Sequence, residues 1–227
     1  PMFEAVIQSP LFGIVLSVMA FEAGIWIQKK TRKAICNPLV IAIILCIAIL
    51  VLFDIPLEAY NLGGDIINLF LGPATAVLAL NIYNQMDILK KHFWPVVAGC
   101  TAGSVTSIGS VFLLCKAFGL DESITRALLP KSCTTPIAVG IAESQGGVVA
   151  IAMVAVLLTG LIGAVAAPLF AKWFHIKSPV AQGLATGACS HALGTTKALE
   201  MGDVQGAMSG ISIGICGIIT VILSLFL

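Results

Sequence analysis

The stretch GACSHALGTTKALEMGD, from Gly187 to Asp203, decides the fold of this chain. It places His191, Lys197 and Glu200 among small residues, and the apolar runs on either side are long enough to cross a bilayer. Polar, glycine-rich backbone persists at membrane depth only where it is buried in protein or lines a water-filled cavity. The stretch therefore predicts a broken helix inside a membrane protein.

The composition supports an all-α polytopic membrane protein. Of the 227 residues, 59% are hydrophobic and 10% are charged, whereas a soluble domain carries about 25% charged residues. A net charge of +1 gives no sign of nucleic-acid binding. The seven cysteines show no CxxC pattern and no histidine at metal-ligand spacing, so we expect neither a metal nor another cofactor. No nucleophile or phosphate-binding motif is present, and we expect no enzymatic activity.

Apolar runs of about 20 residues predict membrane-spanning helices. Five runs reach this length, at 5–27, 35–53, 93–115, 147–171 and 204–227. Three apolar segments carry Gly or Pro near the middle and should break into half-helices, at 61–83, 124–143 and 179–200. We expect a single membrane domain over 1–227 with about five to six spanning helices. Residues 1–118 should be mainly scaffold helices with one broken helix at 61–83.

Basic loops at 28–33, 87–92 and 172–177 indicate the cytoplasmic side and put the N-terminus outside. With the helix at 147–171 running inward, segment 124–143 must enter and leave on the outer side as a re-entrant hairpin. A shift of 56 residues lays Cys133-Thr134 on Cys189-Ser190, and a shift of 57 lays Glu143 on Glu200. Residues 119–227 would then be two hairpin-plus-helix units of opposite orientation. If 179–200 crosses the membrane instead, the C-terminus is cytoplasmic.

The hairpin tips carry the candidate binding residues. Hydroxyls, a lysine and half-helix N-termini suit a small carboxylate. The candidates are Lys131, Ser132, Thr134 and Thr135 at the first tip, Ser190, His191, Thr195, Thr196 and Lys197 at the second, and Thr75 and Asn81 in the broken segment 61–83. The alternative is structural: hydroxyls that only pack between helices and lysines that reach the interface. Glu143, Glu200 and His191 are candidates for proton coupling, although both glutamates fit solvated turns and His191 fits a satisfied buried imidazole.

Four stretches together resemble the LrgB/CidB family over essentially the whole chain. They are NPLVIAI (37–43), YNLGGDIINLFLGPATAVLAL (60–80), LLPKSCTTPIAVGIAESQGG (128–147) and GLATGACSHALGTTKALEMGDVQGAMS (183–209). The resemblance implies a protein of the bacterial inner membrane with a small holin-like partner of the LrgA/CidA kind. It marks Lys131, Ser132, Thr134, Thr135, Pro136, Ser190, His191, Gly194, Thr195 and Glu200 as signature positions. The family often has proline where this chain has Asn81, so helix breaking there is less certain.

Two functions follow from these observations. The resemblance links bacterial members to pyruvate uptake and to control of murein hydrolases, and it links plant relatives to glycolate and glycerate transport. Our leading hypothesis is a secondary transporter of small monocarboxylates, such as pyruvate or glycolate, held between the hairpin tips. The alternative is a holin- or antiholin-like protein that modulates murein hydrolases and autolysis. Because 227 residues leave little scaffold, we expect a homodimer or a higher oligomer in the lipid bilayer.

Overall fold

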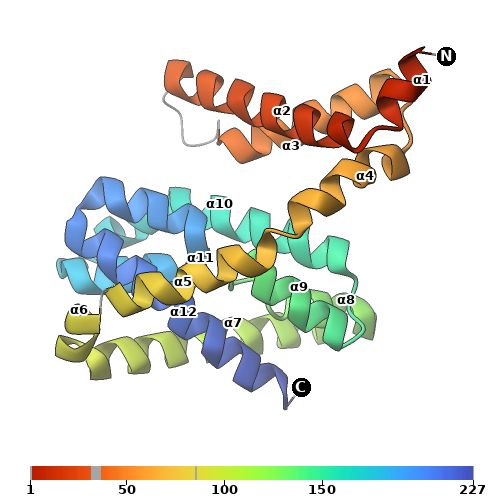
Figure 1. Cartoon of the computed structure of the whole chain (residues 1–227). Helices are drawn as coiled ribbons and strands as arrows, with labels where there is room; N and C mark the ends of the chain where they lie inside the picture. Colours follow the sequence, from red (N-terminus) through yellow and green to blue (C-terminus); the bar gives the residue numbers. More distant parts are fainter. Residues whose placement is uncertain (1, 32–36, 85, 227) are drawn as a thin grey trace. The chain divides into compact units, whose positions relative to one another are not determined.

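The computed structural model describes residues 2–31, 37–84 and 86–226. Every regular element among these residues is an α-helix, which agrees with the all-α polytopic class expected from the composition. The chain divides into two compact units, Pro1–Thr75 and Ala76–Leu227 (Figure 1). Each unit is described by itself.

The first unit contains four helices and the start of a fifth. They are α1 (Met2–Ile7), α2 (Pro10–Thr31), α3 (Pro38–Leu52), α4 (Leu57–Asn68) and the first part of α5 (Leu71–Asn84). The predicted run 5–27 is split, because α1 ends before Pro10, whose ring nitrogen cannot continue a helix. Helices α2 and α4 cross where two glycines meet: a Cβ added to Gly13 would lie 3.1 Å from the Cα of Gly63. This close approach requires glycine on both helices.

Within the described ranges, four helices are long and apolar enough to span a membrane: α2, α7 (Phe93–Ala117), α10 (Val149–Trp173) and α12 (Asp203–Ser224). The span predicted at 35–53 is the 15-residue helix α3, about 22 Å long by helical rise and shorter than the ~30 Å hydrocarbon core. Residues 35 and 36 lie outside the described part of the chain. The segment 61–83 is broken as expected, but at Leu69–Phe70. Pro73 falls within the first turn of α5, where its missing N–H costs little.

The first hairpin consists of α8 (Glu122–Leu128) and α9 (Thr135–Ser144). Its arms are antiparallel: the Val148 N–H donates to the Ser123 carbonyl at the base (3.3 Å), and Ala127 packs with Ala142 further along. The segment therefore enters and leaves at one end, as expected for a re-entrant hairpin.

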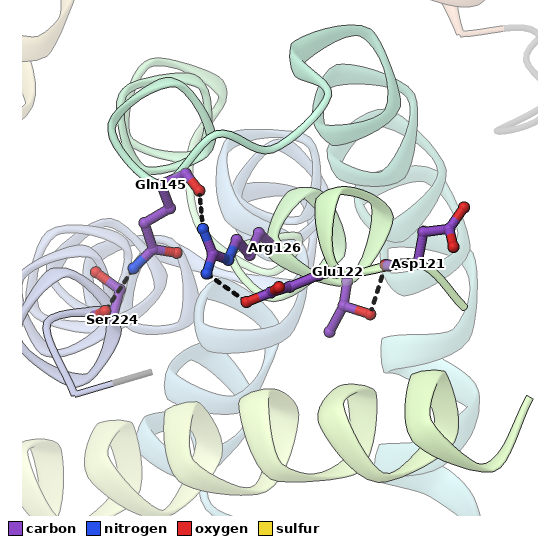
Figure 2. Close-up of polar contacts among 6 residues, drawn as sticks. Asp121, Glu122, Arg126, Gln145 and Ser224 are labelled. Carbon is purple, nitrogen blue, oxygen red and sulfur yellow. Dashed lines mark hydrogen bonds and ion pairs between the residues drawn. The ribbon is translucent and has the colours of Figure 1, made fainter. Parts of the chain in front are cut away.

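Polar contacts fasten the base of this hairpin (Figure 2). Arg126 pairs with Glu122 on its own helix and donates through Nη1 to the Gln145 carbonyl (2.5 Å) at the end of α9. The Gln145 side chain in turn donates to the Ser224 carbonyl (2.5 Å) at the end of α12. Three segments far apart in the sequence are joined at this point.

The second hairpin lies within α11 (Pro179–Met201), which reverses at His191. The first arm runs parallel to α12. A Cβ added to Gly183 would lie 2.8 Å from the Cα of Gln205, and one added to Gly187 would lie 2.8 Å from the carbonyl carbon of Ser209. Contacts therefore advance in the same direction along both helices.

The second arm of α11 runs antiparallel to α12. Thr195 hydrogen-bonds Ser209 (Oγ1 to Oγ, 2.7 Å), and Leu199 packs on Gly206 nearer the start of α12. The two arms of α11 thus run in opposite directions, with backbone dihedrals of φ 41° and ψ −138° at His191 marking the reversal. Of the two arrangements left open by the sequence, the structure has the hairpin.

The two hairpins approach α10 from opposite ends. The base of the first adjoins the N-terminus of α10 through Val148, and the base of the second follows its C-terminus through Pro179. Short α6 (Met86–Lys91) precedes α7, and α7 and α12 pack against α11 around a core that includes Cys100, Met208 and Ile211. The second unit, yellow to blue in Figure 1, therefore contains two opposed hairpin-plus-helix arrangements.

Candidate functional site

The first hairpin tip is the connection 129–134 between α8 and α9. It is held by the Cys133 N–H and thiol, which both donate to the Pro130 carbonyl (3.1 and 2.9 Å). Thr134 is the N-terminal cap of α9, in extended conformation, and Pro136 is the second residue of the helix. Proline suits this position because the first N–H groups of a helix have no intrahelical partner. The free N–H groups of α9 therefore lie at the tip.

Lys131 belongs to a short polar chain at this tip. Its Nζ donates to Ser132 Oγ (3.1 Å), and the Ser132 hydroxyl hydrogen-bonds Ser107 of α7 (Oγ to Oγ, 2.8 Å). Among the described residues no carboxylate lies within 4.0 Å of the Lys131 ammonium. The half-buried cation is thus available to an anion.

The second tip is centred on His191, which is buried. The reversal brings its imidazole to α10, where Nε2 lies 2.9 Å from the Val156 carbonyl. The His191 carbonyl accepts a hydrogen bond from Thr195 Oγ1 (3.0 Å). The second arm of α11 begins here, so its first N–H groups also lie at a tip.

Both tips meet on the same part of α10. The Val156 side chain packs with Cys133 and Ala138 of the first hairpin, while the Val156 carbonyl faces His191 of the second. Lys131 lies within electrostatic range of Cys189, next to the second reversal. The structure therefore brings together the two groups of residues that the sequence predicts for the site.

Two hydroxyls at the tips are buried and have no hydrogen-bond partner within the described part of the chain. They are Thr134 Oγ1, on a residue that is 5% exposed, and Ser190 Oγ, on a residue that is fully buried. A third such side-chain atom within the described ranges is Gln145 Oε1; the amide nitrogen of the same side chain does form a hydrogen bond. A buried polar atom without a partner is costly unless water or a ligand completes it. Each tip thus presents one hydroxyl suited to an additional polar group.

The other predicted residues lie in varied surroundings. Thr135 is half-buried in the first turn of α9, and Thr196 is exposed and bonds the Ala192 carbonyl (3.3 Å). Lys197 pairs with Glu200 (2.6 Å) on the exposed face of α11. Glu143 is exposed in the last turn of α9. The side chains of Thr75 and Asn81 lie outside the described residues.

The residues of α7 and α10 that contact the tips could not be identified from the sequence. Ser107 lies in a charge-free run, where a serine usually signals helix packing. Gly160 and Gly163 lie in a similar run, and a Cβ at either would meet the His191 ring or the Ser190 side chain. The Val156 carbonyl is a backbone group and gives no residue-type signal at all.

Opposed broken-helix hairpins with half-helix N-termini and polar side chains at their tips are the site architecture of many secondary transporters. The fold and the site thus define a multi-pass α-helical membrane protein with a paired-hairpin centre.

The comparisons with known proteins agree with this class and identify the family. Residues 17–227 match the LrgB-like family, and the chain belongs to it. It is 40% identical over 215 residues to the antiholin-like protein LrgB of Bacillus cereus (strain B4264), an alignment that covers 94% of each chain. The antiholin-like protein LrgB of Bacillus anthracis (strain CDC 684 / NRRL 3495) matches to the same extent. No solved structure matches the chain.

Proposed function

We propose that this chain is an antiholin-like protein of the bacterial cell membrane that acts with a small holin-like partner of the LrgA/CidA kind and modulates murein hydrolase activity and autolysis. The observation that carries the proposal is 40% identity over 94% of the chain to relatives named antiholin-like. Extension of the match from residue 17 to 227 supports a role for the whole helical assembly.

The test is autolysis in a bacterial host that lacks its own copies of the two genes. Four strains are compared, which express the chain alone, the holin-like partner alone, both proteins or neither, and the loss of turbidity and the murein hydrolase activity of each culture are measured. We expect co-expression to change the autolysis rate relative to the partner alone. Equal rates in all strains that contain the partner would reject the proposal.

A second candidate, a secondary transporter of small monocarboxylates such as pyruvate or glycolate, is favoured by the paired tips. Thr134 and Ser190 supply two uncommitted hydroxyls, and Lys131 supplies a cation without a carboxylate partner among the described residues. A carboxylate between the tips would accept from all three groups and from half-helix N–H groups. The other predicted binding residues stay candidates, namely Ser132, Thr135, His191, Thr195, Thr196, Lys197, Thr75 and Asn81.

The chain alone, reconstituted in proteoliposomes, provides the transport test. We expect saturable uptake of labelled pyruvate or glycolate, and loss of that uptake in Lys131→Ala and in Thr195→Ala. Dependence of uptake on the proton gradient, altered in His191→Gln, Glu143→Gln or Glu200→Gln, would identify the coupling residue. Absence of saturable uptake together with leakage of unrelated dyes would exclude transport. Cross-linking in the same liposomes tests the expected homodimer.

A further inference from the structure

A surface cavity with basic residues in its lining lies away from the tips, at the C-terminal end of α10. It has a volume of about 400 Å³ and is lined by residues of α10, of the connection to α11, and of both ends of α11. Three lining residues are basic or can become so, namely Lys172, His175 and Lys177, and none of the eight lining residues is acidic. The volume lies in the range of small-ligand pockets.

The backbone holds the basic residues at one place. His175 has φ 53°, and the helix end forms a Schellman motif: the Ile176 N–H donates to the Ala171 carbonyl (2.9 Å) and the His175 N–H to the Lys172 carbonyl (3.2 Å). This turn folds the chain back over the end of α10. Lys172 and Lys177 therefore line the same cavity although the helix ends between them.

The surroundings of the cavity point to the headgroup region of a membrane. The cavity lies at the C-terminal end of α10, which is long and apolar enough to span a membrane, and the exposed aromatic residues Phe170, Trp173 and Phe174 gather at this helix end. Phe170 stacks on Phe174 and meets Trp173 edge to face. Aromatic residues gather where a span leaves the hydrocarbon core. Basic pockets at this depth on the cytoplasmic side attract the phosphates of anionic lipids.

The second hairpin forms the other wall of the cavity. Gln182 of the first arm and Met201 at the end of the second arm both line it. Gln182 also fixes the connection, because its Nε2 donates to the Ile176 carbonyl (2.7 Å), and it accepts from Gln205 of α12 (3.2 Å). A ligand here would contact both arms of the hairpin at its base.

We propose that this cavity binds the phosphate of an anionic phospholipid and thereby fastens the base of the second hairpin to the end of α10. Lys172 and Lys177 provide the charge, and His175 and the Gln182 amide provide hydrogen bonds to the headgroup. The proposal is independent of the function proposed above, because it concerns neither the tips nor a partner protein.

Trp173 gives a direct test, since it directly follows the lining residue Lys172 in the sequence, is exposed, and is one of three tryptophans. In the variant Trp26→Phe/Trp94→Phe, its fluorescence is measured in nanodiscs that contain either phosphatidylglycerol or phosphatidylcholine with brominated acyl chains, over the same series of mole fractions. We expect half-maximal quenching by the anionic lipid at about 30-fold lower mole fraction, because each of the two lysines contributes about fivefold. Lys172→Gln/Lys177→Gln should abolish this difference.

Lys90→Gln/Lys91→Gln in the same background removes two exposed lysines from another helix end and should preserve the preference. Equal quenching by both lipids in the parent protein, or a preference retained in Lys172→Gln/Lys177→Gln, would overturn the proposal. Glycerol 1-phosphate is added as a second arm. An unchanged preference supports the lipid as the ligand, whereas relief of quenching would show that the site takes a soluble phosphate and would overturn the lipid assignment.

Discussion

Thr134 Oγ1 and Ser190 Oγ are buried hydroxyls at matching positions of the two hairpins, and neither has a hydrogen-bond partner among the described residues. They are 56 positions apart, the same shift that superposes Cys133-Thr134 on Cys189-Ser190 in the sequence. Thr134 stands at the first reversal, and Ser190 directly precedes the second. The internal sequence repeat thus relates two hydroxyls, one at each tip, that both lack a hydrogen-bond partner among the described residues.

The first prediction compares Ser190 with Thr195. Ser190→Ala removes a hydroxyl that forms no hydrogen bond in the described chain, so the unfolding temperature should stay equal or rise. Thr195→Val removes bonds to the His191 carbonyl and to buried Ser209 and should lower the free energy of unfolding by about 1–3 kcal/mol. Thermal unfolding in detergent measures both. A larger loss for Ser190→Ala would show that its hydroxyl is committed to the fold.

The second prediction tests the reversal at His191. Alanine at φ 41° is strained by about 1–2 kcal/mol, whereas glycine adopts this conformation without that strain. Both substitutions remove the imidazole and its bond to Val156, so this loss cancels in the comparison. His191→Gly should therefore unfold at a higher temperature than His191→Ala. In an uninterrupted helix the order would be reversed, because glycine is about 1 kcal/mol less favourable than alanine.

A third prediction concerns the packing of the second hairpin tip against α10. A Cβ added to Gly160 would lie 2.5 Å from Cε1 and 2.7 Å from Nε2 of His191. Gly160→Ala should thus displace the tip and lower the free energy of unfolding by about 1–3 kcal/mol. Gly140→Ala on α9 is the matched control, since no atom lies within 4 Å of its added Cβ. Equal stability of the two variants would contradict the contact.

The fourth prediction concerns the base of the first hairpin, shown in Figure 2. Glu122 is exposed, so Glu122→Gln should change the free energy of unfolding by less than about 1 kcal/mol. Arg126→Ala also removes the charge-assisted bond to the Gln145 carbonyl and should cost more, about 1.5–3 kcal/mol. The free energies of unfolding of both single variants and of the double variant distinguish the contribution of the ion pair from that of the hydrogen bond between the hairpin arms. A double variant no less stable than Glu122→Gln alone would show that the Gln145 contact contributes nothing.

The sequence predicted the class and the broken segments because membrane burial constrains composition and length. Charge-free runs locate α7, α10 and α12 to within a few residues. Glycine and proline locate the breaks less closely: the break in 61–83 lies at Leu69–Phe70, and Pro73 stands in the first turn of the half-helix that follows, where proline is tolerated. Residue pattern thus identifies the broken segments but not the residue at which each chain reversal occurs.

The site was predictable in its side chains and not in its surroundings. Lys131 and His191 stand out as polar residues in apolar runs; His191 meets α10, whereas Lys131 bonds Ser132 at the first tip. Their distinct environments depend on long-range packing: His191 meets a backbone carbonyl, and Ser132 meets Ser107 25 positions earlier. The pairing of Lys197 with Glu200 could not be singled out from the sequence, because an i, i+3 spacing fits both an ion pair and separate roles.

The two tips differ in the length of chain that makes the turn. The first uses six residues, 129–134, between separate helices, whereas the second concentrates its reversal in His191. Six residues offer twelve backbone dihedrals over which a change of path can be distributed. A reversal at one residue has only the two backbone dihedrals of His191, whose ring is held by the Val156 carbonyl and packs closely on Gly160. The two tips of the repeat therefore differ in stiffness: the first can distribute a change of chain path over several residues, whereas the second must take it at one.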